Sequence, residues 1–202
     1  MGKTLDFYFD FGSPTAYLAW TQLPAICAQT GTELVYKPML LGGVFQATGN
    51  HSPVQIPAKG SYMFQDLARF ARRYGVPLRL NPHFPVNTLL LMRGATGLQM
   101  RADPRFTDYV AAMFRAMWVD ARNMGDLAVA GATLAEAGVD AAALLALANE
   151  PAVKEQLKAD TQAAVARGVF GAPTMFVGAD MFWGQDRLDF VREALQAYAS
   201  SI

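Results

Sequence analysis

Residues 4–19, TLDFYFDFGSPTAYLA, contain the pattern that decides the fold. The first part alternates in polarity and is rich in β-forming side chains, which predicts a strand, and the FGSP sequence then ends it. Ser13 fits the N-cap of a helix and Pro14 its first position, and apolar residues continue at helical spacing up to Gly31. A second strand is predicted over residues 33–38, ELVYKP. The opening of the chain therefore predicts two parallel strands joined by a right-handed helical crossover.

The rest of the chain changes character twice. Residues 40–60 carry Gly, Pro and Asn at short intervals and predict a loop. Where apolar residues recur three and four apart, we expect helices over residues 61–75, 86–101, 104–124, 126–137, 140–149, 154–168 and 187–199. Short strands are predicted over residues 172–178 and 180–184.

This order of elements predicts an α/β protein of the thioredoxin-like class. Residues 1–40 and 151–202 would form the thioredoxin-like domain. Residues 41–150 would form an all-α domain, inserted between the second strand and the second core helix.

Composition excludes several classes of function. The chain has 202 residues, 52% of them hydrophobic, and 17 Lys and Arg balance 17 Asp and Glu, which argues against a nucleic-acid partner. The N-terminus lacks a basic region followed by an apolar run, and no stretch is apolar enough to span a membrane, so we expect a soluble, cytoplasmic protein. One cysteine, Cys27, and two histidines, His51 and His83, exclude an internal disulfide and argue against a zinc site.

The thioredoxin-like order gives two short motifs a chemical meaning. Gly171-Ala172-Pro173-Thr174 lies where that fold has a cis-proline loop, so the Ala172–Pro173 bond is predicted to be cis, with an ordinary trans turn as the alternative. The backbone of Ala172 could pair with an extended peptide. Ser13 stands where oxidoreductases of this fold carry Cys-x-x-Cys, which excludes disulfide exchange by this chain alone. Ser13 could serve only as a helix cap, but a hydroxyl at a helix N-terminus also favours a bound anion such as a thiolate.

Three segments carry a resemblance that covers essentially the whole chain. FYFDFGSPTAYLA at 7–19, RGVFGAPTMFVG at 167–178 and MFWGQDRLDFV at 181–191 closely resemble the 2-hydroxychromene-2-carboxylate isomerase family. That family is similar to the kappa-class glutathione transferases. The resemblance implies a glutathione-dependent enzyme and a homodimer.

The resemblance also implies roles for individual residues. The active serine of the family falls on Ser13, and the loop that holds the cysteinyl part of glutathione falls on Ala172 and Pro173. Residues implied to bind the rest of glutathione are Trp183, Gly184, Gln185 and Asp186 at the γ-glutamyl end, Lys59 at the glycyl carboxylate, and Asn50 in the same loop as Lys59. Many relatives have Asn or Ser at the position of Gln185. Taken without the resemblance, Lys59 and Asp186 would be read as solvated charges.

The organic substrate is expected between the two domains. Residues 81–87, NPHFPVN, resemble a family segment that lines this cleft. Phe84 could stack on an aromatic ring, His83 or Asn87 could bond its polar groups, and Asn81 begins the segment. The alternative is a helix-entry loop with Asn87 as its cap.

Three hypotheses for function follow. In the first, the protein converts 2-hydroxychromene-2-carboxylate-type substrates to trans-o-hydroxybenzylidenepyruvate-type products in aromatic catabolism, by reversible addition of the glutathione thiolate. In the second, the same glutathione site serves a kappa-class-like transferase or peroxidase. In the third, the chain is a redox-inactive thioredoxin-like module that binds peptides beside Pro173.

Overall fold

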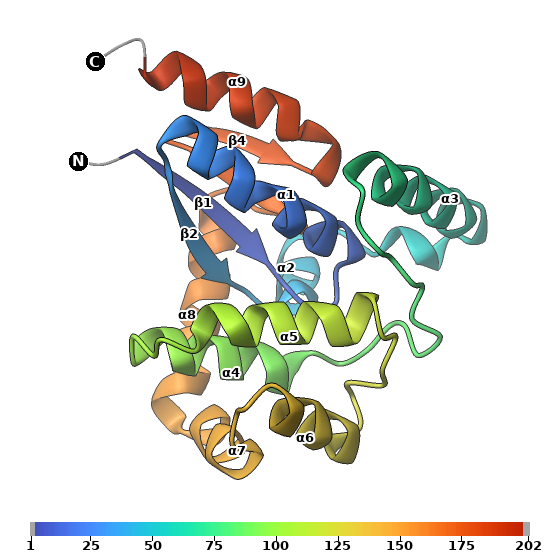
Figure 1. Cartoon of the computed structure of the whole chain (residues 1–202), viewed down its shortest axis with the longest axis vertical. Helices are drawn as coiled ribbons and strands as arrows, with labels where there is room; N and C mark the ends of the chain where they lie inside the picture. The colour runs from blue at the N-terminus through green and yellow to red at the C-terminus, as the bar shows by residue number, and fades with distance from the viewer. Residues whose placement is uncertain (1–2, 200–202) are drawn as a thin grey trace.

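The computed structural model describes residues 3–199 and contains a four-stranded sheet (Figure 1). Strand β1 (Thr4–Phe9) leads through helix α1 (Pro14–Thr30) to β2 (Glu33–Pro38), and β1 and β2 pair in parallel, as predicted. Strand β3 (Thr174–Val177) runs antiparallel to β1, and β4 (Asp180–Trp183) pairs antiparallel with β3. The strand order is β2-β1-β3-β4, which places β1 and β3, the two strands that precede and follow the predicted site loops, side by side at the centre.

Alternation along the central strands builds two cores. Phe7 and Phe9 of β1 and Met175 of β3 point to one face, which α1 and α9 (Leu188–Ala199) cover. Tyr8 and Phe176 point to the other face, which α2 (Leu41–Thr48) and α8 (Pro151–Ala166) cover. Because side chains alternate between the faces of a strand, one aromatic-rich sequence supplies both cores.

The helical insertion stands between β2 and α8, where the sequence placed it. It contains α3 (Pro57–Tyr74), α4 (Leu89–Met100), α5 (Phe106–Trp118), α6 (Leu127–Glu136) and α7 (Ala141–Asn149). Helix α2, which begins at Leu41, precedes these helices, and α8, which begins at Pro151, follows them.

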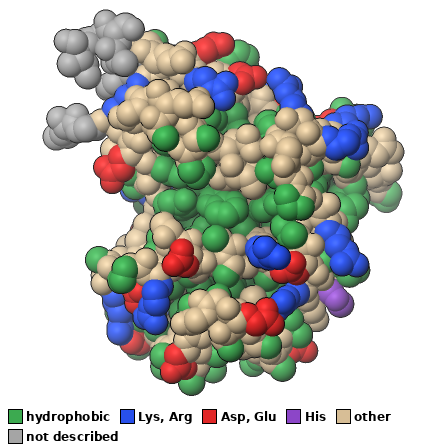
Figure 2. Space-filling model, in the orientation of Figure 1, with side chains coloured by type: hydrophobic (Ala, Val, Ile, Leu, Met, Phe, Trp, Pro, Cys, Tyr) green, Lys and Arg blue, Asp and Glu red, His purple; other side chains and the backbone are tan. Residues whose placement is uncertain are grey.

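The insertion shares one continuous core with the sheet. The ring of Phe114 on α5 lies 5.8 Å from Phe9 and 5.0 Å from Phe11, centroid to centroid. Figure 2 shows hydrophobic side chains gathered in a band across the middle of this face, between α1 and α5. Trp20 of α1 contributes to this contact, with its ring 5.3 Å from Phe114. Burial of these rings ties the two halves of the molecule together, since aromatic side chains bury the most apolar area.

The prediction of a loop over residues 40–60 is wrong. Leu41–Thr48 form α2, a 3-10 turn follows at Pro53–Gln55, and α3 already begins at Pro57. Tertiary contacts stabilise α2 despite its glycines: Val44 is fully buried against the second face of the sheet, and the Leu41 N–H donates to the Asp10 carboxylate at 2.8 Å. A Cβ at Gly43 would lie 3.2 Å from Thr161 Cγ2, so the small residue permits the close approach of α2 to α8.

Candidate active site

Ser13 is the N-cap of α1, as the sequence predicted. Its Oγ accepts a hydrogen bond from the Ala16 N–H at 3.1 Å, and the side chain is only 4% exposed. The Ser13 N–H donates to the Asp10 carbonyl at 3.0 Å, which holds the turn between β1 and α1. The hydroxyl therefore sits at the positive end of the α1 dipole in a fixed position.

The loop before β3 meets Ser13. The Ala172–Pro173 bond is cis, so that prediction is confirmed. The Ser13 hydroxyl lies 3.0 Å from the Ala172 carbonyl oxygen, and the Thr15 hydroxyl donates to the same oxygen at 3.0 Å. The two hydroxyls are 2.8 Å apart. Thr15 was not anticipated by the sequence analysis, although its hydroxyl, two residues after the N-cap, was a signal that a second donor faces the loop.

Two neighbouring side chains hold the same loop from its other side. Asn50 Nδ2 donates to the Phe170 carbonyl at 2.8 Å, which places Asn50 beside the loop that contains Ala172. The Trp183 ring packs on Phe170 with centroids 5.0 Å apart, and a Cβ at Gly171 would lie 2.6 Å from Trp183 Nε1. Glycine is needed at this position because any side chain would displace the tryptophan.

The segment after β4 runs alongside the loop. The Gly184 N–H donates to the Pro173 carbonyl at 3.0 Å, with Gly184 at a φ of 101° that favours glycine. Gln185 is 7% exposed, and its side-chain amide makes no hydrogen bond with any described residue. Its backbone carbonyl accepts from the Tyr74 hydroxyl at 2.6 Å. The structure thus brings Trp183, Gly184 and Gln185 next to the loop that faces Ser13.

Asp186 borders a separate small cavity. Its carboxylate pairs with the adjacent Arg187 guanidinium at 2.6 Å. The cavity, of about 50 Å³, also has Arg73, Tyr74 and Arg192 among its lining residues. Burial raises the pKa of the Tyr74 hydroxyl to about 12, so this group is a hydrogen-bond donor at neutral pH. Charges of both signs at this place suit a zwitterionic group.

Lys59 lies in the first turn of α3 and is exposed. The sequence analysis placed it in a loop, and the early start of α3 at Pro57 corrects that assignment. No contact brings Lys59 together with Ser13 or Ala172 among the described residues.

Hydrogen bonds of Asn81 hold residues 81–87, the segment proposed to line the substrate cleft. Asn81 is 6% exposed, and its Nδ2 donates to the carbonyls of Met117 at 3.0 Å and Arg122 at 2.8 Å. Its Oδ1 accepts from the His83 N–H at 2.9 Å. Both ends of the Asn81 amide are therefore used inside the protein, where they shape the segment.

Three other residues of this segment are more accessible. His83 and Asn87 are exposed, and Asn87 Oδ1 accepts from the Leu89 N–H at 3.0 Å; the N-cap of α4 is Thr88, not Asn87. Phe84 is half-buried between Phe64 and Trp118, with ring centroids 6.5 Å and 5.8 Å away. Contact of these three with a substrate remains a prediction.

Asp10, which the sequence analysis did not select, joins the insertion to the Ser13 turn. Its Oδ1 accepts from the Gly12 N–H at 2.8 Å and from the Thr88 hydroxyl at 2.7 Å, and its Oδ2 accepts from the Leu41 N–H. Burial raises the pKa of the Asp10 carboxyl above its ordinary value, and these three hydrogen bonds act in the opposite direction. An acidic residue within an apolar strand end, FDF, was the only signal in the sequence.

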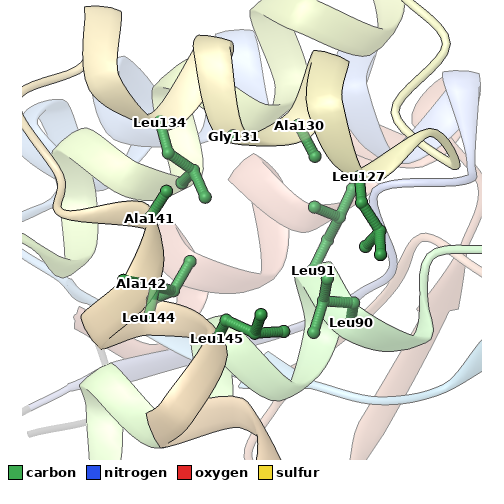
Figure 3. Close-up of a pocket in the computed structure, with 10 residues that line it drawn as sticks. All are labelled: Leu90, Leu91, Leu127, Ala130, Gly131, Leu134, Ala141, Ala142, Leu144 and Leu145. Atoms are coloured by element: carbon green, nitrogen blue, oxygen red, sulfur yellow. The ribbon is translucent and has the colours of Figure 1, made fainter.

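A larger cavity lies away from these groups. It has a volume of about 180 Å³ and lies between α4, α6 and α7 (Figure 3). Its lining consists of Leu90, Leu91, Leu127, Ala130, Gly131, Leu134, Ala141, Ala142, Leu144 and Leu145. Because it lacks polar side chains that could orient a substrate, and none of the predicted site residues lines it, we do not assign the active site there.

The remaining chemistry of the described residues is limited. Burial raises the pKa of the Cys27 thiol to about 11, which keeps it uncharged and unreactive at neutral pH. No cluster of three potential metal ligands occurs in residues 3–199. No helix in that range is both long and apolar enough to cross a membrane.

Comparison with known proteins decides the family. A model of the DSBA-like thioredoxin domain matches residues 4–196. A 2-hydroxychromene-2-carboxylate isomerase of Sphingobium xenophagum is 38% identical over 201 residues, which cover 96% of this chain and 99% of the relative. The chain belongs to the 2-hydroxychromene-2-carboxylate isomerase family. The family and the thioredoxin-like fold class predicted from the sequence are thus confirmed.

Two further proteins are similar to this chain over nearly its whole length. A solved structure of a 2-hydroxychromene-2-carboxylate isomerase superposes with a TM-score of 0.86 at 30% identity, and the match covers 98% of this chain and 97% of that chain. Human glutathione S-transferase kappa 1 is 26% identical over 209 residues, which cover 96% of this chain and 91% of the relative.

Proposed function

We propose that this protein is a glutathione-dependent isomerase that acts on 2-hydroxychromene-2-carboxylate or a closely related aromatic carboxylate. The observation that carries the proposal is the Ser13 hydroxyl, which lies at the N-terminus of α1 and 3.0 Å from the Ala172 carbonyl. Relatives named for this isomerisation are up to 38% identical over nearly the whole chain. A homodimer is a further proposal that rests on the family resemblance alone, and a cytoplasmic location is a further proposal that follows the expectation from the sequence.

The polar groups beside Ser13 fit glutathione. The Ala172 N–H makes no hydrogen bond with any described residue, so it can donate to the cysteinyl part of the tripeptide, whereas the Ala172 carbonyl already accepts from the Ser13 and Thr15 hydroxyls. The unpaired amide of Gln185 and the carboxylate of Asp186 can receive the γ-glutamyl end. In this proposal Lys59 faces the glycyl carboxylate, and Asn50 fixes the loop through Phe170.

When bound, glutathione supplies a thiolate whose reversible addition to the conjugated substrate permits rotation about the bond that the addition makes single. Ser13 contributes a hydrogen-bond donor directed at the sulfur, and the first turn of α1 contributes its positive dipole. Both effects favour the charged form of the sulfur and lower its pKa. Ser13 has no basic partner among the groups that contact it, so it acts here as a stabiliser and not as a nucleophile.

The proposed place for the organic substrate is the side of Ser13 that faces residues 81–87. Thr88, which follows this segment, is linked through Asp10 to Gly12, so the end of the segment lies close to the Ser13 turn. The exposed side chains His83 and Asn87 are available for the polar groups of the substrate, and Phe84 for its ring.

A second candidate function keeps the same cofactor site. The 26% identity with human glutathione S-transferase kappa 1 favours a transferase or peroxidase that consumes glutathione. Measuring free thiol during turnover separates the two, because isomerisation regenerates glutathione whereas conjugation or peroxide reduction depletes it stoichiometrically.

The decisive test is a titration of bound glutathione, in which thiolate absorbance is followed against pH for the wild type and for Ser13→Ala. We expect the wild type to hold the thiol pKa clearly below the free reference of about 8.5, and the substitution to raise it. Turnover of Ser13→Ala should fall roughly 10²- to 10³-fold, as expected for loss of one donor to a reacting anion, while glutathione affinity changes little.

A matched control is Ser61→Ala, which removes an exposed hydroxyl on α3 and should change neither quantity. Binding without a lowered pKa would contradict the addition mechanism. Absence of any glutathione-dependent rise in melting temperature at millimolar concentration would favour the third hypothesis, a redox-inactive binding module.

A further inference from the structure

The Ser13 hydroxyl has one proton and more than one acceptor for it. One lone pair of Ser13 Oγ accepts a hydrogen bond from the Ala16 N–H at 3.1 Å, so the Ser13 O–H remains to donate to one of the other acceptors. The Ala172 carbonyl oxygen lies at 3.0 Å and Thr15 Oγ1 at 2.8 Å, and a bound sulfur would be a third acceptor. A proton committed to the Ala172 carbonyl cannot stabilise a thiolate.

Thr15 supplies the Ala172 carbonyl with a donor of its own. Thr15 Oγ1 donates to this oxygen at 3.0 Å, the same distance as Ser13. If the Ser13 proton turns toward a sulfur, the carbonyl keeps one hydrogen bond. Without the Thr15 hydroxyl, the same rotation would leave a sparsely solvated acceptor with no partner, which is energetically unfavourable.

We infer that Thr15 is a positioning residue, whose hydroxyl holds the Ala172 carbonyl so that the Ser13 proton is free to hydrogen-bond the sulfur of a bound thiol. The inference rests on the proposed function, because it needs glutathione beside Ser13. The N-terminus of α1 then carries two hydroxyls with different roles: the Thr15 hydroxyl holds the Ala172 carbonyl in place, and the Ser13 hydroxyl hydrogen-bonds the cofactor sulfur.

The position of Thr15 allows a clean substitution. The side chain is half-buried in the first helical turn and makes its hydrogen bonds to Ala172 and Ser13 only. Thr15→Val keeps the branched shape and removes the hydroxyl, whereas Thr15→Ser keeps the hydroxyl and removes a methyl group. A matched control is Thr21→Val on the same helix, since the Thr21 hydroxyl donates to the Leu18 carbonyl at 2.7 Å, away from the loop.

The experiment measures the thiol pKa of bound glutathione, its dissociation constant, kcat and the melting temperature for these variants. For Thr15→Val we expect the thiol pKa to rise by roughly half a unit to one unit and kcat to fall about three- to tenfold, with the dissociation constant and melting temperature nearly unchanged. Thr15→Ser should restore the wild-type pKa, and Thr21→Val should not alter it.

The outcomes separate this inference from the proposed function. If the wild type lowers the thiol pKa and Thr15→Val lowers it equally, the inference is overturned and the proposed function stands. If Thr15→Val weakens glutathione binding and thermal stability but leaves the thiol pKa and kcat unchanged, Thr15 is structural and the inference is again overturned. If the wild type itself binds no glutathione, or binds it without lowering its thiol pKa, the proposed function fails and the inference with it.

Discussion

The loop at residues 170–174 and the segment at residues 81–87 approach the Ser13 turn in opposite ways. In the first, side chains from distant elements converge on backbone groups: Ser13 and Thr15 on the Ala172 carbonyl, and Asn50 on the Phe170 carbonyl. In the second, one side chain, Asn81, satisfies three backbone groups and leaves its neighbours exposed. The loop at residues 170–174 therefore offers backbone groups to a ligand. The segment at residues 81–87 offers exposed side chains, and the internal hydrogen bonds of Asn81 hold the backbone that carries them.

Asp10 connects these two regions. It binds the Thr88 hydroxyl at the end of the second segment and the Gly12 N–H beside Ser13 with the same oxygen. The Trp118 indole, which packs on Phe84, adds a second link by donating to the Phe11 carbonyl at 2.7 Å. These contacts therefore couple the position of residues 81–87 to that of the Ser13 turn.

The largest effect on stability is expected from Asn81→Ala. It would leave the Met117 and Arg122 carbonyls without this donor, so we expect the free energy of unfolding to fall by about 3 kcal/mol, measured by urea denaturation. Asn87→Ala, which removes one exposed hydrogen bond to the Leu89 N–H in the same segment, should cost no more than about 1 kcal/mol. Equal losses for both would show that Asn81 does not frame the segment.

Asp10→Asn should have the next largest effect, about 2 kcal/mol at pH 4, because the amide nitrogen that replaces one carboxyl oxygen cannot accept a hydrogen bond. The effect should depend on pH. Burial raises the pKa of Asp10 above 3.8, so the native state holds this proton more tightly than the unfolded chain does. The contribution of this group to stability is thus complete below pH 3.8 and is lost as the pH rises through the raised pKa.

Urea denaturation between pH 4 and pH 7 tests the direction of this pH dependence, through the free energy of unfolding of the wild type and of Asp10→Asn. The stability advantage of the wild type over Asp10→Asn should shrink as the pH rises. An advantage that grows with pH would mean that the hydrogen bonds from Gly12, Leu41 and Thr88 outweigh burial and that the pKa of Asp10 is lowered.

Asn50→Ala should act on the ligand more than on the fold. Loss of one hydrogen bond to the Phe170 carbonyl is worth about 1 kcal/mol, which corresponds to roughly fivefold weaker glutathione binding by calorimetry. Asn149→Ala is the matched control, since Asn149 Nδ2 donates to a carbonyl on its own helix at 2.9 Å. Unchanged glutathione affinity in Asn50→Ala would remove this residue from the proposed site.

The smallest effect is expected at Cys27. The Cys27 thiol is buried and has a pKa of about 11. At pH 8 it should therefore react with iodoacetamide about tenfold more slowly in the native protein than in the urea-unfolded chain. Mass spectrometry of the labelled protein measures both rates. Rapid labelling of the native protein would show that the chain itself offers a reactive thiol, which would complicate the assignment of any thiolate signal to glutathione.

The sequence by itself determined the order of the elements, the place of the helical insertion, Ser13 as the cap of α1 and the cis-proline loop. The elements and the cap depend on local pattern, such as the alternation in TLDFYF and the Ser-Pro helix start, whereas the cis bond follows from the place of GAPT in the predicted order of elements. The tertiary structure alone decided that residues 41–48 are helical, that Asn81 frames its segment, that Asp10 bonds the Gly12 N–H beside Ser13, and that Thr15 bonds the Ala172 carbonyl. The reason is separation along the chain: Thr15 and Ala172 are 157 residues apart, and Asp10 and Thr88 are 78 apart. Hydrogen bonds between such distant groups leave no periodic trace in the sequence, because they form only once the sheet has brought the ends of β1 and β3 together.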